Sequence, residues 1–95
     1  MFGWSYYSLP VAYSGRSIQV NLTQTSNGDC DLYIRAAALP SRNAYDARDI
    51  STKASFVLTV PSAQVGTYYI GVYGFQSCDY TMLALVTSKL LSFKL

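Results

Sequence analysis

The sequence predicts an all-β protein, a small antiparallel β-sandwich of two sheets. In several segments rich in Val, Ile, Thr and Tyr, apolar and polar residues alternate with a period of two, as in half-buried strands. Gly, Pro, Asn and Asp mark frequent turns between these segments, which is typical of sandwiches. A chain of 95 residues is long enough for one domain with one hydrophobic core.

Six strands are expected, in chain order. They cover about residues 4–9, 18–23, 32–35, 56–60, 68–73 and 80–86. The first strand is expected to stop before Pro10, because proline has no backbone N–H to donate to a neighbouring strand. Residues 36–39 have the one helical pattern, which Pro40 would end. The sandwich domain is therefore expected over residues 4–87, after an N-terminal extension of residues 1–3.

Two segments do not fit the strand pattern. Residues 37–55 form a long connection, which is either a functional loop or a solvated crossover between the sheets. Its side chains best suited to contacts are Arg42, Tyr45, Asp46, Arg48 and Asp49. Residues 88–95 form an apolar C-terminal tail, where polar residues are usual. This tail is expected to be an extra strand, a link to a following domain or a subunit contact.

The composition excludes several functions. Charged residues make up 13% of the chain, against about 25% in an average protein, and the formal net charge is +2. The Lys and Arg residues are scattered, so no nucleic-acid partner is expected. Every apolar run is far shorter than the roughly 20 residues that a membrane span needs. Because the chain has no His, Ser-His-Asp and Cys-His catalysis is impossible, and neither enzyme activity nor a catalytic residue is expected.

The two cysteines are candidates for a disulfide. Cys30 and Cys78 each stand at the start of a predicted strand and share the parity of its inward residues. Two inward cysteines at strand ends could meet across neighbouring strands or across the two sheets, and the bond would stabilise a small core. The alternative is a pair of buried free thiols, as in cytosolic proteins.

Asn21, Leu22 and Thr23 form an N-glycosylation sequon. Asn21 has the parity of the polar face of its strand, where a glycan could be tolerated. An ordinary exposed asparagine is the alternative. A glycan and a disulfide would both imply the secretory route.

Three aspartates lie beside the two cysteines. Asp29 and Asp31 flank Cys30, and Asp79 follows Cys78, so a disulfide would bring three carboxylates into one region. A calcium ion would relieve their repulsion, with Asp46 or Asp49 completing the site. The alternative is that these aspartates accept hydrogen bonds from backbone N–H groups in turns.

The nine tyrosines exceed what one small core can bury. Tyr33, Tyr69 and Tyr73 have outward parity, and Tyr45 lies in the long connection. These four residues are the candidate binding surface, because exposed tyrosines stack on sugars or anchor protein partners. Cross-strand aromatic pairing that stabilises the sheet is the alternative.

The chain resembles the bacterial-type pre-peptidase C-terminal domain over about residues 4–87. The resemblance is carried by residues 6–11, 15–22, 28–35, 39–41, 45–46, 66–74 and 80–83. Its most specific parts are Asp-x-Asp-Leu-Tyr at residues 29–33 and Gly-Thr-Tyr-Tyr-Ile-Gly-Val-Tyr-Gly at residues 66–74. The family is similar to the collagen-binding domains of secreted collagenases. The resemblance implies a jelly-roll-like sandwich that is non-catalytic and appended to secreted proteins, and Asp29 and Asp31 match the Asp-x-Asp of a family in which some members bind calcium.

These observations lead to one functional expectation and one alternative. The expected function is that of a non-catalytic extracellular module that mediates adhesion or self-assembly, with a protein partner or a second copy of itself. The alternative is a module that binds a glycan or a matrix protein and is appended to a secreted enzyme. Because the N-terminus lacks the pattern of a signal peptide, a secreted chain would be part of a larger precursor. No cofactor is expected apart from calcium.

Overall fold

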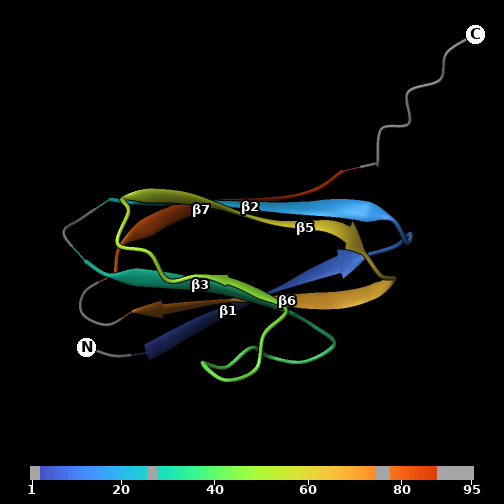
Figure 1. Cartoon of the computed structure of the whole chain (residues 1–95), viewed down its shortest axis with the longest axis horizontal. Coiled ribbons are helices and arrows are strands. Elements are labelled where there is room, and N and C mark those ends of the chain that lie inside the picture. Colours follow the sequence, from blue (N-terminus) through green and yellow to red (C-terminus); the bar gives the residue numbers. More distant parts are fainter. Residues whose placement is uncertain (1–2, 26–27, 75–77, 88–95) are drawn as a thin grey trace, which may run out of the picture.

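The computed structural model describes residues 3–25, 28–74 and 78–87 and contains two antiparallel sheets packed face to face (Figure 1). The four-stranded sheet has the order β1-β6-β3-β4, and the three-stranded sheet has the order β5-β2-β7. The strands are β1 (Gly3–Val11), β2 (Arg16–Gln24), β3 (Cys30–Ala36), β4 (Ala47–Asp49), β5 (Ser55–Ala63), β6 (Gly66–Gly74) and β7 (Tyr80–Thr87). The predicted all-β antiparallel sandwich is confirmed. The predicted tail at residues 88–95 lies outside the described residues.

The core lies between the two sheets and follows from the period-two pattern of the strands. Ile18, Val20 and Leu22 of β2 are fully buried, and they belong to one cluster with inward residues of the other sheet, such as Ile34 and Ile70. Burial of each such side chain contributes about 1.5–3 kcal/mol. The residues predicted to point inward in these strands therefore do so, and the residues that alternate with them lie on the two outer faces of the sandwich.

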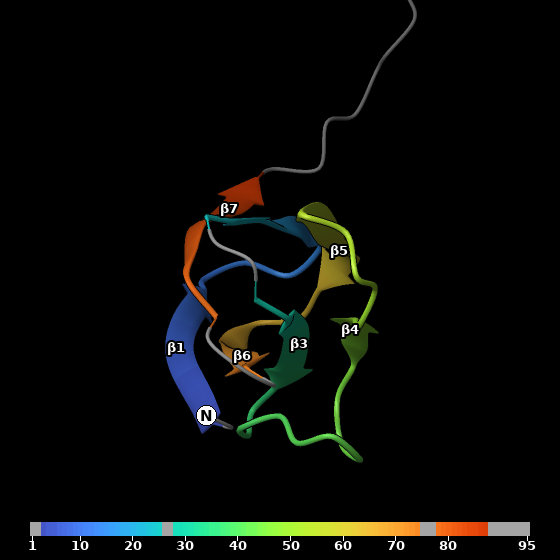
Figure 2. The same ribbon diagram turned by 90° about the vertical axis from the view of Figure 1, so that its left-hand side faces the viewer.

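The chain crosses repeatedly from one sheet to the other. Among the described strands, only β3 and β4 are both consecutive in sequence and paired in a sheet, whereas β1 pairs with β6, and β2 pairs with β5 and β7. Viewed from the end, β4 stands beside β3 at the margin of its sheet, and it also contacts β5 (Figure 2). The segment between β3 and β4 passes below the four-stranded sheet in both views.

A disulfide and a pair of tyrosines join the two layers. The disulfide between Cys30 and Cys78 connects the start of β3 in one sheet to the residues that precede β7 in the other, with 5.4 Å between the Cα atoms. The predicted disulfide is thus confirmed over the free-thiol alternative. The hydroxyl groups of Tyr7 on β1 and Tyr80 on β7 share a hydrogen bond between the sheets. Burial and this bond raise the pKa of Tyr80 to about 12.

Three local predictions were wrong, each for a physical reason. β1 and β5 continue through Pro10 and Pro61, because both are edge strands and their prolines need no donor on the free side. β4 was missed because three residues are too few to show a period. The expected helical turn at residues 36–39 is absent from the described structure. Instead Ala37 has a φ of 67°, and its N–H donates to the carbonyl of Thr67 at 2.8 Å.

Within the described residues, no helix is both long and apolar enough to span a membrane.

Candidate functional site

The outer face of the four-stranded sheet carries an aromatic cluster, defined as Trp4, Tyr6, Tyr33, Tyr45 and Tyr73. The register places Trp4 directly opposite Tyr73, and the two ring centroids are 5.0 Å apart. Trp4 also lies 5.1 Å from the ring of Tyr33 and stacks on Tyr6 at 5.4 Å. Each such pair stabilises the fold by about 0.5–1.5 kcal/mol, in addition to the contribution from the surface area that it buries. The cluster forms a second apolar layer outside the sandwich core.

Gly71 makes room for this layer. It lies on the outer face of β6, opposite Tyr33 of β3 and Tyr6 of β1. A Cβ atom at this position would come within 2.9 Å of both Pro40 and the ring of Trp4. A glycine within a strand pattern marks such a close approach, and it is the sequence signal that could have located the cluster.

The segment between β3 and β4 is held against the aromatic cluster. Pro40 is buried, and its carbonyl accepts a hydrogen bond from the hydroxyl of Tyr6 at 3.2 Å. The carboxylate of Asp46 accepts from the N–H of Ala36 at 2.7 Å, while the N–H of Asp46 donates to the carbonyl of Ile34 at 2.8 Å. The connection expected at residues 37–55 therefore has defined contacts with the sheet, and residues 47–49 within it form β4.

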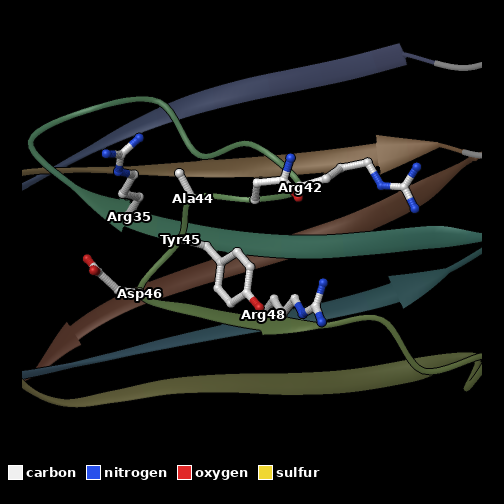
Figure 3. Close-up of a pocket in the computed structure, with 7 residues that line it drawn as sticks. Arg35, Arg42, Ala44, Tyr45, Asp46 and Arg48 are labelled. Atoms are coloured by element: carbon white, nitrogen blue, oxygen red, sulfur yellow. The ribbon is translucent and has the colours of Figure 1, made fainter.

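This segment and the outer face of β3 enclose an open depression of about 680 Å³ (Figure 3). We call it the arginine depression. Its lining residues are Arg35, Arg42, Asn43, Ala44, Tyr45, Asp46 and Arg48. In the close-up, the Tyr45 ring lies between Asp46 and Arg48, and the Arg42 side chain runs along the sheet away from Arg35.

Aromatic rings hold two of the three guanidinium groups. The guanidinium of Arg48 lies 4.7 Å from the ring centroid of Tyr45, and that of Arg42 lies 5.4 Å from the ring centroid of Tyr73. The Tyr45 ring in turn packs edge-on against Tyr33 at 5.7 Å. Cation–π contacts of this kind contribute about 0.5–2 kcal/mol and restrict the rotamers of the arginines. The guanidinium of Arg35 is held by a hydrogen bond to the carbonyl of Leu39 at 3.3 Å.

A buried carboxylate lies next to the depression. Asp31 is only 3% exposed, on the outer face of β3 opposite Tyr73. Burial above all, and the charges of Asp29 and Asp49 to a smaller extent, raise its pKa to about 6 against the opposing charges of Arg42 and Arg48. Asp31 is therefore the acidic group whose ionisation is most costly in this part of the fold.

The four tyrosines predicted as a binding surface have different surroundings. Tyr33 has the predicted outward parity but is only 1% exposed, so its prediction as an exposed contact residue was wrong. It is buried because Trp4 and Tyr45 cover it. Tyr69 and Tyr73 are half-buried, and Tyr45 is exposed at the depression. Trp4 and Arg35 were not among the predicted site residues, because their roles depend on contacts between distant segments.

The aspartates predicted as calcium ligands do not form one cluster among the described residues. Within residues 3–25, 28–74 and 78–87, no group of three or more Asp, Glu, His or Cys side chains is placed to hold a metal ion. Cys30 points into the core, so Asp31 beside it faces the outer surface of the four-stranded sheet. Asp79 instead precedes β7 in the other sheet, where its carbonyl accepts from the N–H of Thr25.

Asn21 lies at the centre of the outer face of the three-stranded sheet. Its partners in the register are Val57 of β5 and Leu83 of β7, which are 53% and 56% exposed. The Oδ1 atom of Asn21 is buried without a hydrogen-bond partner among the described residues. This face is thus partly apolar rather than polar, and glycosylation of Asn21 stays a prediction.

Comparison with known proteins supports the resemblance found in the sequence. The family model for the bacterial pre-peptidase C-terminal domain matches residues 5–74, which include most of β1, all of β2 to β6 and the whole arginine depression. Alkaline serine exoprotease A of Vibrio alginolyticus is 33% identical over 73 residues. That alignment covers 77% of this chain and 13% of the exoprotease.

Proposed function

The chain belongs to the bacterial pre-peptidase C-terminal domain family, and from this premise we propose that it is a non-catalytic binding module of a larger extracellular protein. The alignment with only 13% of an exoprotease is what an appended module would give. The disulfide between Cys30 and Cys78 favours an oxidising compartment, since such bonds are rare in the cytosol. Under this proposal the chain contributes binding, and catalysis belongs to other parts of a larger protein.

The arginine depression is the observation that carries the binding function. Arg35 lies on β3 and Arg48 on β4, and the hydrogen bonds of Asp46 hold the segment between these two strands in place. A site that is already ordered loses less conformational entropy when a ligand binds. The proposed ligand is a polymer of the extracellular matrix, either a glycan or a structural protein. Because the depression is open, a polymer chain can lie across it.

Co-sedimentation with insoluble polymers tests this function. The oxidised chain is mixed with cellulose, chitin, fibrillar collagen and cross-linked pectate, and the fraction bound is measured at several protein concentrations. Tyr45→Ala removes the ring that holds Arg48 and is expected to weaken binding several-fold.

Tyr13→Ala is the matched control, because Tyr13 is also exposed and lies against an arginine, Arg16, away from the depression. It is expected to bind like the unaltered chain. Absence of binding to every polymer, or an equal loss in both variants, would contradict a binding site at the depression.

Self-assembly is a second candidate function, favoured by the character of β7. It is an edge strand without a charged residue, glycine or proline, and it exposes Leu83, Leu85 and Val86. The other edges are protected by Pro10 in β1, Pro61 in β5 and the three-residue length of β4. A free, uncharged edge is a template for pairing with the same strand of a second copy.

Analytical ultracentrifugation over a range of concentrations tests this second candidate. The unaltered chain is expected to form dimers, and Leu83→Lys is expected to shift it towards monomer. Val57→Lys places the same charge at an equally exposed position on β5 and is expected to leave the dimer intact. A chain that stays monomeric at every concentration would exclude self-assembly through β7.

A further inference from the structure

We propose that the arginine depression binds acidic polysaccharides, that is, polymers whose sugars carry carboxylate or sulfate groups. This inference rests on the proposed binding function and names its ligand class. It is carried by three observations: the charge of the lining, the fixed guanidinium groups and the nearly complete absence of apolar side chains in the depression.

The charge of the lining is positive. Three arginines face the depression, against the single carboxylate of Asp46. That carboxylate already accepts a hydrogen bond from the N–H of Ala36, which stabilises its charge. Asp31 is buried beneath the surface and cannot contact a ligand directly. A ligand in the depression therefore contacts an excess of guanidinium groups, which favours oxyanions.

The guanidinium groups are also held in place before any ligand binds. Arg48 lies on Tyr45, Arg42 lies on Tyr73, and Arg35 donates to the carbonyl of Leu39. A planar guanidinium can donate two parallel hydrogen bonds to one carboxylate or sulfate group. Because the stacked arginines have already lost part of their rotamer freedom, less entropy is lost when these bonds form.

The remaining lining favours a sugar polymer over a protein. Protein interfaces depend on apolar anchors that fill closed pockets, and Ala44 is the one small apolar residue of this open lining. Asn43 and the Tyr45 hydroxyl instead offer donors and acceptors suited to sugar hydroxyl groups. An extended polysaccharide can lie across such a depression and present its anionic groups to several arginines.

Affinity electrophoresis of the full oxidised chain tests the inference. The chain is run in gels that contain polygalacturonate, dextran sulfate, neutral dextran or poly-glutamate, at low and at high salt. Polygalacturonate or dextran sulfate is expected to retard the chain, and high salt is expected to weaken this retardation. The two acidic polymers together show whether carboxylate or sulfate is the preferred group.

Three variants locate the site. Arg48→Gln is expected to weaken binding by about tenfold, the usual effect of losing a hydrogen bond to a charged group. Arg48→Lys keeps the charge but loses the planar fork, and an intermediate loss is expected. Arg16→Gln is the matched control, because Arg16 also lies on a tyrosine, Tyr13, but belongs to the three-stranded sheet. Circular dichroism confirms that each variant is folded.

The outcomes separate this inference from the function on which it rests. Equal retardation by neutral dextran would overturn the acidic ligand class, and an equal loss in Arg16→Gln would overturn the placement of the site at the depression. Either result would leave a binding module in place. Equal retardation by poly-glutamate would overturn the preference for a sugar polymer. If no gel retards the chain, the inference is also overturned. The proposed function is excluded only if, in addition, the chain binds none of the insoluble polymers.

Discussion

Asp31 is the residue at which burial and charge conflict most directly. Its folded-state pKa of about 6 lies above the usual value of 3.8, so the folded chain binds a proton more tightly than the unfolded chain. The free energy of unfolding is therefore expected to fall as the pH rises from about 4 to about 6, and to stay lower above that. Since a tenfold change in proton affinity corresponds to about 1.4 kcal/mol, the expected decrease is about 2–3 kcal/mol.

Urea unfolding of the unaltered chain and of Asp31→Asn at both ends of this pH range measures the effect. The variant is expected to be the more stable protein at neutral pH and to lose most of the pH dependence. A variant that unfolds at the same urea concentration as the unaltered chain at neutral pH would show that Arg42 and Arg48 compensate the buried charge fully.

Gly71 provides a second prediction at the residue scale. Gly71→Ala places a Cβ atom 2.9 Å from Pro40 and from Trp4, so the ring or the covering segment must move. Overpacking of this kind destabilises a protein by about 1–3 kcal/mol. The emission of Trp4, the single tryptophan, is expected to shift with the change in its surroundings. Gly3→Ala is the control, because nothing lies within 4 Å of its Cβ position.

The sequence could predict the parity of single residues but not what covers them. Alternation along β3 correctly placed Cys30 towards the core and Tyr33 on the outer face. Burial of Tyr33 depends on Trp4 and Tyr45, which come from other segments of the chain, and no local pattern reports such contacts. The arginines of the connection were noticed as side chains suited to contacts, but their arrangement around one depression required the fold.

At the scale of the elements, the segment between β3 and β4 is ordered by few contacts, and Asp46 makes two of them. Asp46→Ala removes the acceptor of the Ala36 N–H, and a lost hydrogen bond to a charged group costs about 1.5–3 kcal/mol. Faster amide hydrogen exchange is expected at Ala36 and through residues 37–46, together with weaker ligand binding. Exchange rates measured by NMR check this prediction.

Asp49→Ala is the matched variant for this experiment. The carboxylate of Asp49 also accepts one backbone N–H in the same connection, from Ser51 at 2.9 Å, but it does not line the depression. Exchange at residues 37–46 is expected to stay slow in Asp49→Ala. If both variants exchange alike, Asp46 does not have the special ordering role that its contacts suggest.

A strand was predictable from the sequence where its alternation of apolar and polar residues is long, because this pattern does not depend on the neighbouring strands. The nine-residue strands β2, β5 and β6 show several full periods, so their existence could be read from the sequence. Their ends could not, because proline is tolerated or excluded according to whether the strand lies at an edge. The order of strands in a sheet is set by pairing between distant segments, and periodicity contains no information about it.

At the scale of the whole molecule, the disulfide is the main covalent constraint on a small core. It closes a loop of 48 residues between Cys30 and Cys78, for which the chain-entropy model gives about 4 kcal/mol. Replacing both cysteines by serine is expected to lower the melting temperature by at least about 15 °C in a domain of this size. Calorimetry of the unaltered chain and of the double variant, each with and without a reducing agent, checks this. The reducing agent is expected to lower the melting temperature of the unaltered chain and to leave that of the double variant unchanged.

The pairing of the strands also divides the molecule in an unexpected way. Within the part of the chain that the structure describes, each of the five ladders joins one of β1 to β3 with one of β4 to β7, and no ladder lies within either half. The segment over the arginine depression is the link between the halves. A peptidase that cut this link would leave two interlocked fragments, still tied by the bond between Cys30 and Cys78. Neither fragment contains a complete sheet, so the two would have to assemble by complementation. The domain could therefore be nicked at this link without falling apart.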